Sequence, residues 1–290
     1  MTPVELAVTH HQVPVRNGNI HVAEAGHEFD KCVVFIHGFP ESWWSWRHQV
    51  EAFVTAGYHV LAVDLRGYGD STREGPFDLR TLAADVAEVI RVRARGRAAV
   101  VGHDWGGATA WTLAAHHPER VARVAVLNCP LPRVLQEKLV RRPSFAQLKR
   151  SWYIFFFQIP GIPELLLSRH QGRAIADIIR KASRHHANTS DAELAPFCEG
   201  ASTAAGVRGM LGAYRAALPA AFKLDVLPPI TMPAMLMWGL EDHALSFDEL
   251  APETERAIPG LRVEALAGCG HFPQSERPEL VNRTLIEFIG

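Results

Sequence analysis

Residues 101–110 read VGHDWGGATA, and the aspartate near their centre decides both the fold and the chemistry that this sequence predicts. The valine-rich run at 98–104 is typical of a buried strand, and residues 105–117 are typical of a helix. Asp104 therefore stands on a tight strand-to-helix turn, where a nucleophile can be exposed. The alternative is that Asp104 only caps the helix, as aspartate often does.

Small residues surround this turn and leave room for the strand and the helix to approach each other. They are Gly102, Gly106 and Gly107. The helix N-terminus also favours an anion, because its first backbone N–H groups lack partners within the helix.

The composition indicates an ordinary globular protein. The chain has 290 residues, of which 48% are hydrophobic and 21% charged, and its formal net charge is −1. This balance gives no reason to expect nucleic acid or a membrane as partner. Four widely spaced cysteines show neither a zinc pattern nor a disulfide scaffold, which favours a reducing cytoplasm. These are Cys32, Cys129, Cys198 and Cys269.

Neither a signal peptide nor a membrane span is expected. The N-terminal residues 1–19 contain no basic segment followed by an apolar run. The most apolar stretch, residues 152–167, is interrupted by Gln158, Pro160 and Glu164, so it cannot form a spanning helix. It could still line an apolar pocket.

Short apolar runs alternate with helix-like segments through most of the chain. Continuous apolar strands indicate a sheet that is covered on both faces, and the alternation indicates mostly parallel pairing in an α/β fold. Strands are expected near 11–15, 19–26, 32–38, 58–65, 98–104, 121–128, 233–239 and 261–268. Helices are expected near 45–53, 79–94, 105–117, 246–258 and 276–289.

The pattern changes after the sixth strand. No convincing strand occurs between Cys129 and about Phe222, and four segments there look helical. They are 135–142, 143–158, 173–183 and 206–219. We therefore predict a core made of residues 1–129 and 223–290, with a helical cap at 130–222 inserted after the sixth strand.

A second turn follows the strand at 32–38. There His37-Gly38 would direct the backbone N–H of Phe39 toward Asp104, and with the N–H of Trp105 it would form an oxyanion hole. The alternative is a turn that only ends the strand. The Gly-rich loop at 64–71 is interpreted as mainly structural.

Two further groups complete the expected order of nucleophile, acid and histidine, each at the end of a strand. Asp242 follows the strand at 233–239, with Glu241 as its rival. His271 lies on a glycine-rich loop before the last helix. The other histidines include doublets that are not spaced to chelate a metal from one helix face, so no metal site is expected.

Together these motifs resemble the α/β-hydrolase superfamily over essentially the whole chain. The aspartate nucleophile is similar to that of its epoxide hydrolase and haloalkane dehalogenase branches. The resemblance implies an α/β-hydrolase fold with a lid over a pocket and no cofactor. An aspartate forms an alkyl ester that water can cleave, whereas serine would leave a stable ether, so Asp104 implies attack on saturated carbon.

The chemistry of the leaving group distinguishes the epoxide hydrolase branch from the dehalogenase branch. Opening an epoxide creates an alkoxide, which needs acids with a pKa near 10 such as tyrosine. Tyr153 and Tyr214 occur in contexts that resemble the lid motifs of epoxide hydrolases. Taken singly, each could be an amphipathic core tyrosine.

Dehalogenases are the main alternative. Trp105 could bind a halide, but Phe39 replaces the asparagine typical of haloalkane dehalogenases. The arginines that fluoroacetate dehalogenases carry after the nucleophile are absent, although Trp152 lies next to Tyr153. A non-catalytic receptor for a small hydrophobic ligand is the other alternative.

The resemblance therefore implies an epoxide hydrolase that converts a hydrophobic epoxide to a diol. Asp104 is the expected nucleophile, His271 the base and Asp242 the orienting acid, with Tyr153 and Tyr214 as donors to the epoxide oxygen. The expected pocket residues are His37, Pro40, Trp105, Trp152, Phe156 and Phe272. The sequence leaves open whether the protein is a monomer or a homodimer.

Overall fold

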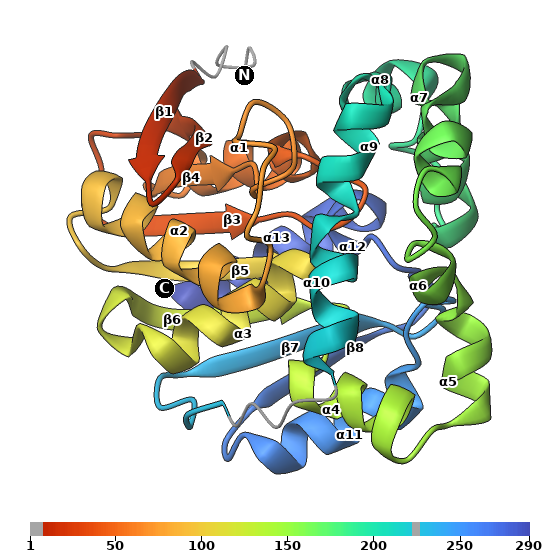
Figure 1. The fold of residues 1–290 in the computed structure, drawn as a ribbon. Coiled ribbons are helices and arrows are strands. Elements are labelled where there is room, and N and C mark those ends of the chain that lie inside the picture. Colours follow the sequence, from red (N-terminus) through yellow and green to blue (C-terminus); the bar gives the residue numbers. More distant parts are fainter. Residues whose placement is uncertain (1–7, 222–226) are drawn as a thin grey trace.

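The computed structural model describes residues 8–221 and 227–290, and its centre is one mixed sheet of eight strands (Figure 1). The strands are β1 (Thr9–Val15), β2 (Gly18–Ala25), β3 (Cys32–Ile36), β4 (His59–Val63), β5 (Ala98–His103), β6 (Val121–Leu127), β7 (Ala234–Gly239) and β8 (Arg262–Leu266). Their spatial order is β1-β2-β4-β3-β5-β6-β7-β8. β2 is antiparallel to both neighbours, and the other neighbouring pairs are parallel. The predicted, mostly parallel eight-stranded sheet is confirmed.

Both faces of the sheet are buried. Every residue of β3, β4, β5 and β7 is buried. Along β3, Val34 and Ile36 enter one hydrophobic core, while Val33 and Phe35 enter the other. Successive side chains of a strand point to opposite faces, so a sheet with two covered faces requires apolar residues at every position.

Helices cover each face of the sheet (Figure 1). On one face, α1 (Arg47–Thr55) and α13 (Pro278–Ile289) contribute to the core that contains Phe35. On the other face lie α2 (Leu79–Arg93), α3 (Trp105–His116) and α11 (Phe247–Ala257). The short helices of the core are η1 (Trp43–Trp46), η2 (Pro118–Arg120) and α12 (Pro273–Glu276).

The lid is the chain between β6 and β7, where the described residues form helices and no strand (Figure 1). Its helices are α4 (Pro132–Gln136), the π-helical turn η3 (Glu137–Arg141), α5 (Phe145–Arg150), α6 (Trp152–Phe156), α7 (Ile162–Ala182), α8 (Asp191–Gly200), α9 (Ala204–Met210) and α10 (Gly212–Ala220). The predicted helical insertion after the sixth strand is confirmed. The predicted boundary between residues 222 and 223 lies outside the described residues.

The lid differs from the sequence prediction in several places. The expected helix over 206–219 is divided into α9 and α10, and α7 begins at Ile162 instead of near residue 173. The expected helix over 143–158 is broken into α5 and α6 at the buried Ser151, whose hydroxyl accepts a hydrogen bond from Gln147 Nε2 at 2.8 Å. Helix α8 was not expected from the sequence. A capping box marks its N-terminus in the sequence, because Ser190 and Glu193 each accept the backbone N–H of the other.

No helix within the described part of the chain is long and apolar enough to cross a membrane.

Hydrogen bonds from three parts of the lid fasten the lid to the core. Tyr68 donates to the carbonyl of Met210 at 3.0 Å, and Arg150 donates to the carbonyl of Asp242 at 2.8 Å. Trp44 Nε1 donates to the carbonyl of Glu193 at 3.2 Å.

A substitution at Gly106 can test how closely α3 approaches β3. A Cβ added at Gly106 would lie 2.0 Å from the carbonyl oxygen of Ile36, and the backbone on both sides would have to move. We expect Gly106→Ala to lower the free energy of unfolding by roughly 3 kcal/mol or more, measured by urea denaturation.

Gly260→Ala is the matched control. No atom lies within 4 Å of its added Cβ, and its φ of +78° costs an alanine about 1 kcal/mol. Equal losses of stability in the two variants would contradict the close approach of α3 and β3.

Candidate active site

Asp104 occupies the turn between β5 and α3 with φ 51° and ψ −119°, a combination that non-glycine residues rarely adopt. The turn holds because backbone packs on backbone around it. A Cβ at Gly102 would lie 2.2 Å from the carbonyl oxygen of Gly106, and a Cβ at Gly38 would lie 2.4 Å from Asp104 Cβ. These contacts bring the carboxylate to the carboxyl ends of the central strands.

The backbone N–H of Phe39 donates to Asp104 Oδ1 at 2.9 Å. Trp105 is the first residue of α3, so its backbone N–H has no partner within the helix. Neither Oδ atom of Asp104 serves as a helix cap for α3. The carboxylate therefore accepts the N–H of the residue that follows β3 by three positions and is not used to cap its own helix.

His271 stands beside Asp104. Its Nε2 lies 3.8 Å from Asp104 Oδ2, and its Nδ1 lies 2.8 Å from Asp242 Oδ2. Both His271 and Asp242 are buried. The three predicted groups are thus brought together in the order carboxylate, imidazole, carboxylate.

Asp242, and not its neighbour, faces the imidazole. Its Oδ1 accepts the backbone N–H groups of Ala244 and Leu245, at 2.7 Å and 3.1 Å. The carboxylate of Glu241 lies 2.8 Å from Arg184 at the surface, so this residue does not replace Asp242.

Asn128 supports this arrangement and was not assigned a role from the sequence. It follows β6 and adopts φ 46°. Its Nδ2 donates to Asp242 Oδ2 at 2.7 Å, and its Oδ1 accepts the N–H of Gly239 at 3.1 Å. The signal in the sequence was its position at the end of the strand predicted near 121–128.

A second buried network lies under the histidine. His103 Nε2 is 2.7 Å from the carbonyl oxygen of His271, and His103 Nδ1 is 2.7 Å from Glu41. Gln274 Nε2 donates to the other oxygen of Glu41 at 2.9 Å. Sequence reasoning missed Glu41, His103 and Gln274, because only the fold brings these distant residues together.

Neighbouring charges and hydrogen bonds shift the pKa values of His271 and Asp242. Burial alone would lower the pKa of His271, but the Asp242 carboxylate, its hydrogen bond and the Asp104 carboxylate raise this pKa to about 9. Burial would raise the pKa of Asp242, yet His271 and the hydrogen bond from Asn128 hold it below its usual value. The histidine is therefore an imidazolium near neutral pH while Asp104 carries its charge.

Tyr153 on α6 and Tyr214 on α10 lie together above this carboxylate. Their ring centroids are 6.0 Å apart, and the ring of Tyr214 lies 4.9 Å from that of Trp105 and 5.3 Å from that of Phe39. Burial and the Asp104 charge raise the pKa of both phenols. Both tyrosines therefore stay protonated and can act as hydrogen-bond donors.

Two side chains hold the tyrosine helices to each other. Gln158 Nε2 donates to the carbonyls of Ile154 on α6 and Tyr214 on α10, at 2.9 Å and 3.1 Å. Arg215 donates to the carbonyl of Phe157 at 3.0 Å and to the buried Glu164 at 2.7 Å. The spacing of the two phenols is thus fixed within the lid.

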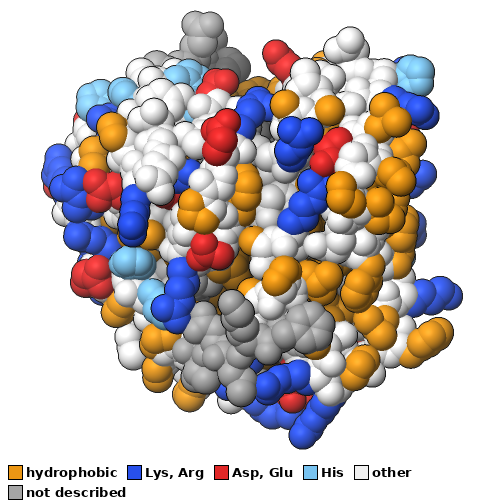
Figure 2. Space-filling model, viewed as in Figure 1, with side chains coloured by type: hydrophobic (Ala, Val, Ile, Leu, Met, Phe, Trp, Pro, Cys, Tyr) orange, Lys and Arg blue, Asp and Glu red, His pale blue; other side chains and the backbone are white. Residues whose placement is uncertain are grey.

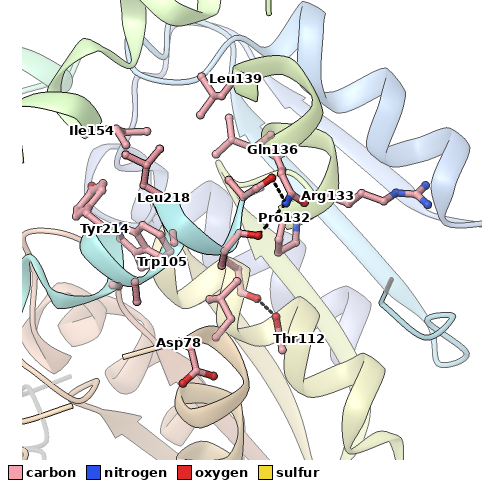
Figure 3. Close-up of a pocket in the computed structure, with 18 of the residues that line it drawn as sticks. Asp78, Trp105, Thr112, Pro132, Arg133, Gln136, Leu139, Ile154, Tyr214 and Leu218 are labelled. Atoms are coloured by element: carbon pink, nitrogen blue, oxygen red, sulfur yellow. Dashed lines mark hydrogen bonds between the residues drawn. The ribbon is translucent and has the colours of Figure 1, made fainter. Parts of the chain in front are cut away.

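An apolar cavity of about 250 Å³ opens next to Trp105 and Tyr214 (Figure 3). Among the expected pocket residues, Trp105 lines this cavity and the other five do not. The side chain of Trp152 is 62% exposed and does not line this cavity, whereas the neighbouring Tyr153 packs on Tyr214. Figure 2 shows that other hydrophobic side chains also lie at the surface of the molecule.

The remaining expected pocket residues have other surroundings. His37 is fully buried, and its Nε2 accepts the N–H of Leu65 at 3.1 Å. Phe272 is buried against the rings of His103 and His271. Pro40 follows a cis peptide bond and is buried, and Phe156 packs on Phe157. No group of three or more potential metal ligands occurs among the residues that the structure describes.

Comparison with known proteins agrees with this geometry. The family described as alpha/beta hydrolase fold matches residues 31–278. The AB hydrolase superfamily protein YfhM of Bacillus subtilis is 35% identical, over 93% of this chain and 94% of that protein. Epoxide hydrolase 4 of Mus musculus is 31% identical, over 97% of this chain and 79% of that protein.

Among solved structures, an epoxide hydrolase from an endophytic Streptomyces superposes with a TM-score of 0.81 at 30% identity, covering 97% of this chain and 95% of that one. The fold, the insertion after β6 and these similarities lead to one conclusion. The chain belongs to the alpha/beta hydrolase family and is an epoxide hydrolase-like member of it.

Proposed function

We propose that this protein is an epoxide hydrolase that converts a hydrophobic epoxide to a vicinal diol through a covalent ester on Asp104. The observation that carries the proposal is the pair of phenols, Tyr214 buried and Tyr153 partly buried, that lie close together beside a carboxylate on a strained strand-to-helix turn. A carboxylate can attack saturated carbon, and two neutral phenols can receive the oxygen that this attack releases.

Ring opening comes first. Oδ1 of Asp104 is held by the N–H of Phe39, so Oδ2 is the oxygen that attacks a ring carbon. The new C–O bond forms as the C–O bond of the epoxide breaks, and the departing oxygen takes a proton from Tyr153 or Tyr214. Phenols suit this step because their ordinary pKa near 10 lies between those of water and of carboxylic acids.

Ester hydrolysis follows. Once Asp104 is esterified it no longer carries a charge, so one of the three carboxylates that raise the pKa of His271 is lost. The proton that His271 carried replaces the one that the tyrosine gave to the departing oxygen, so the imidazole is neutral and the phenol is restored. The imidazole then takes a proton from water, which attacks Cγ of Asp104, and the N–H groups of Phe39 and Trp105 stabilise the oxyanion on Oδ1. When the ester bond breaks, the new hydroxyl on Cγ gives its proton to the departing alkoxide, so the diol leaves while the Asp104 carboxylate and the protonated His271 are restored.

The dehalogenase alternative has less support. Trp105 is the only halide donor that the sequence offers at the turn, and its side chain interacts with the hydroxyl of Tyr214. Diol formation from styrene oxide, measured beside bromide release from 1-bromobutane, separates the two activities. Bromide release without diol formation would overturn the proposal. If neither product forms, the result would favour a non-catalytic binding protein.

His271→Gln should trap the covalent intermediate, because ring opening does not need this base but hydrolysis does. We expect an intact-mass increase equal to one molecule of styrene oxide. Asp104→Asn in the same background is the control and should give no increase. An unmodified His271→Gln protein, with its fold intact by circular dichroism, would count against an ester on Asp104.

Tyr153→Phe and Tyr214→Phe should each slow ester formation by on the order of 100-fold, since each removes one proton donor to the leaving oxygen. Single-turnover measurements follow this step separately from ester hydrolysis, which should change little. Phe156→Leu on the same helix as Tyr153 is the control. Equal rates of ester formation in wild type and both tyrosine variants would refute the role of the phenols.

The pH dependence of stability should report the His271–Asp242 pair. The pKa of His271 is about 9 in the folded protein and about 6.5 when unfolded, so the pair stabilises the fold below pH 6.5. This stability is lost as the pH rises toward 9, by up to about 3 kcal/mol.

Urea denaturation of wild type and Asp242→Asn between pH 6 and 10 measures this effect. The wild-type protein should lose more stability over this range than the variant, because Asp242 is the largest source of the raised pKa. Parallel curves would mean that the imidazolium is not paired with Asp242 in the folded protein.

A further inference from the structure

The apolar cavity beside Trp105 lies away from the triad and has no role in the two chemical steps. It is enclosed by the start of α2, the middle of α3, the α4–η3 segment, and the lid helices α6 and α10. Trp105 and Tyr214 line it at one end, and both also contact the catalytic site. A molecule held at Asp104 could therefore extend past this pair of rings into the cavity.

The polar side chains that line the cavity are occupied by the protein itself. Both oxygens of Asp78 accept hydrogen bonds from Thr81, at 3.1 Å and 2.8 Å. The hydroxyl of Thr112 donates to the carbonyl of Ala108 at 2.8 Å, and Gln136 Nε2 donates to the carbonyl of Ala221 at 2.6 Å. These groups close their hydrogen bonds within the protein, so they are not set to recognise a polar ligand.

Arg133 lies at the cavity edge and does not point into it. Its side chain is exposed, and Figure 3 shows its guanidinium directed away from the space that Trp105, Ile154 and Leu218 face. Arg80, the other cation of the lining, is exposed and has an interaction within the protein. A carboxylate inside the mainly apolar cavity would thus lose its hydration without gaining a partner from Arg133.

Alanines of α10 provide the space. Ala213 and Ala217 are four residues apart, so they lie on the same side of the helix, and both line the cavity. Tyr214 and Leu218 flank them on the neighbouring side and also line it. One small side chain on α10 therefore controls how much room remains beside the catalytic tyrosine.

We propose that this cavity binds the substituent of the epoxide, and that it selects a neutral apolar arm of several carbon atoms over a short or a charged one. This inference rests on the proposed function, because it assigns the substrate class of the same site. The volume of about 250 Å³ lies near the small end of ligand pockets, which favours a medium-length alkyl chain or a single aromatic ring.

The first test compares propylene oxide, 1,2-epoxyhexane and 1,2-epoxyoctane. Each methylene that leaves water for the cavity should raise kcat/KM by roughly fourfold. Ala217→Leu adds three carbon atoms inside the cavity. It should remove most of the gain for the two longer epoxides, and circular dichroism checks that the variant is folded.

Ala195→Leu is the matched control, since Ala195 is exposed on α8 and does not line the cavity. It should preserve the wild-type dependence on chain length. A wild-type kcat/KM that does not depend on chain length, or an Ala217→Leu variant that behaves as wild type, would overturn the inference.

Binding of the product diols keeps this test separate from that of the proposed function. Calorimetry with 1,2-propanediol, 1,2-octanediol and 7,8-dihydroxyoctanoate needs no turnover. We expect 1,2-octanediol to bind most tightly and the carboxylate to bind on the order of 100-fold more weakly than it. Selective binding without turnover of any epoxide would refute the proposed function alone, whereas turnover with equal affinities would refute the role of the cavity.

Discussion

The backbone conformation of Asp104 is the constraint on which the site depends. A non-glycine residue at φ 51° is strained, and the strain persists only because the surrounding backbone leaves no other path. Gly38, Gly102 and Gly106 lie so close to other backbone or Cβ atoms that larger side chains would force the strands and α3 apart. The same packing that positions the Asp104 carboxylate at the end of β5 also brings the N–H of Phe39 to Asp104 Oδ1.

In the proposed mechanism, the charge on Asp104 determines when the phenols act as acids and when His271 acts as a base. Asp104 and Asp242 both raise the pKa of His271, and Asp104 also raises the pKa of the two phenols. In the resting protein the phenols are therefore acids and the histidine is protonated. Under the proposed mechanism, alkylation of Asp104 removes one negative charge from the centre of this group, and the imidazole becomes more available as a base at the step that needs one.

The strands and the triad were predictable from the sequence, because each leaves a local mark. A buried strand in a covered sheet is a short apolar run, and Asp104, Asp242 and His271 each follow such a run. The hydrogen bonds of Glu41, His103, Asn128 and Gln274 join segments that meet only in the fold, so no local pattern in the sequence gives these residues their roles. The break at Ser151 was likewise hidden, because the residues over 143–158 are typical of one continuous helix. The cavity depends on alanines of α10, which carry no chemistry of their own.

Under the proposed mechanism the lid supplies acids and the core supplies the nucleophile, so the distance between the two parts decides whether a phenol can reach the departing oxygen. Arg215 and Gln158 fix the phenols relative to each other through hydrogen bonds within the lid. A separate link joins α9 to the core: Tyr68 donates to the carbonyl of Met210 just before α10, and the backbones of Gly67 and Gly209 pack within a distance that excludes a Cβ on either. Because α10 carries both Tyr214 and the alanines of the cavity, a shift of α10 relative to the core would change the position of the proposed proton donor and the room for the substituent together.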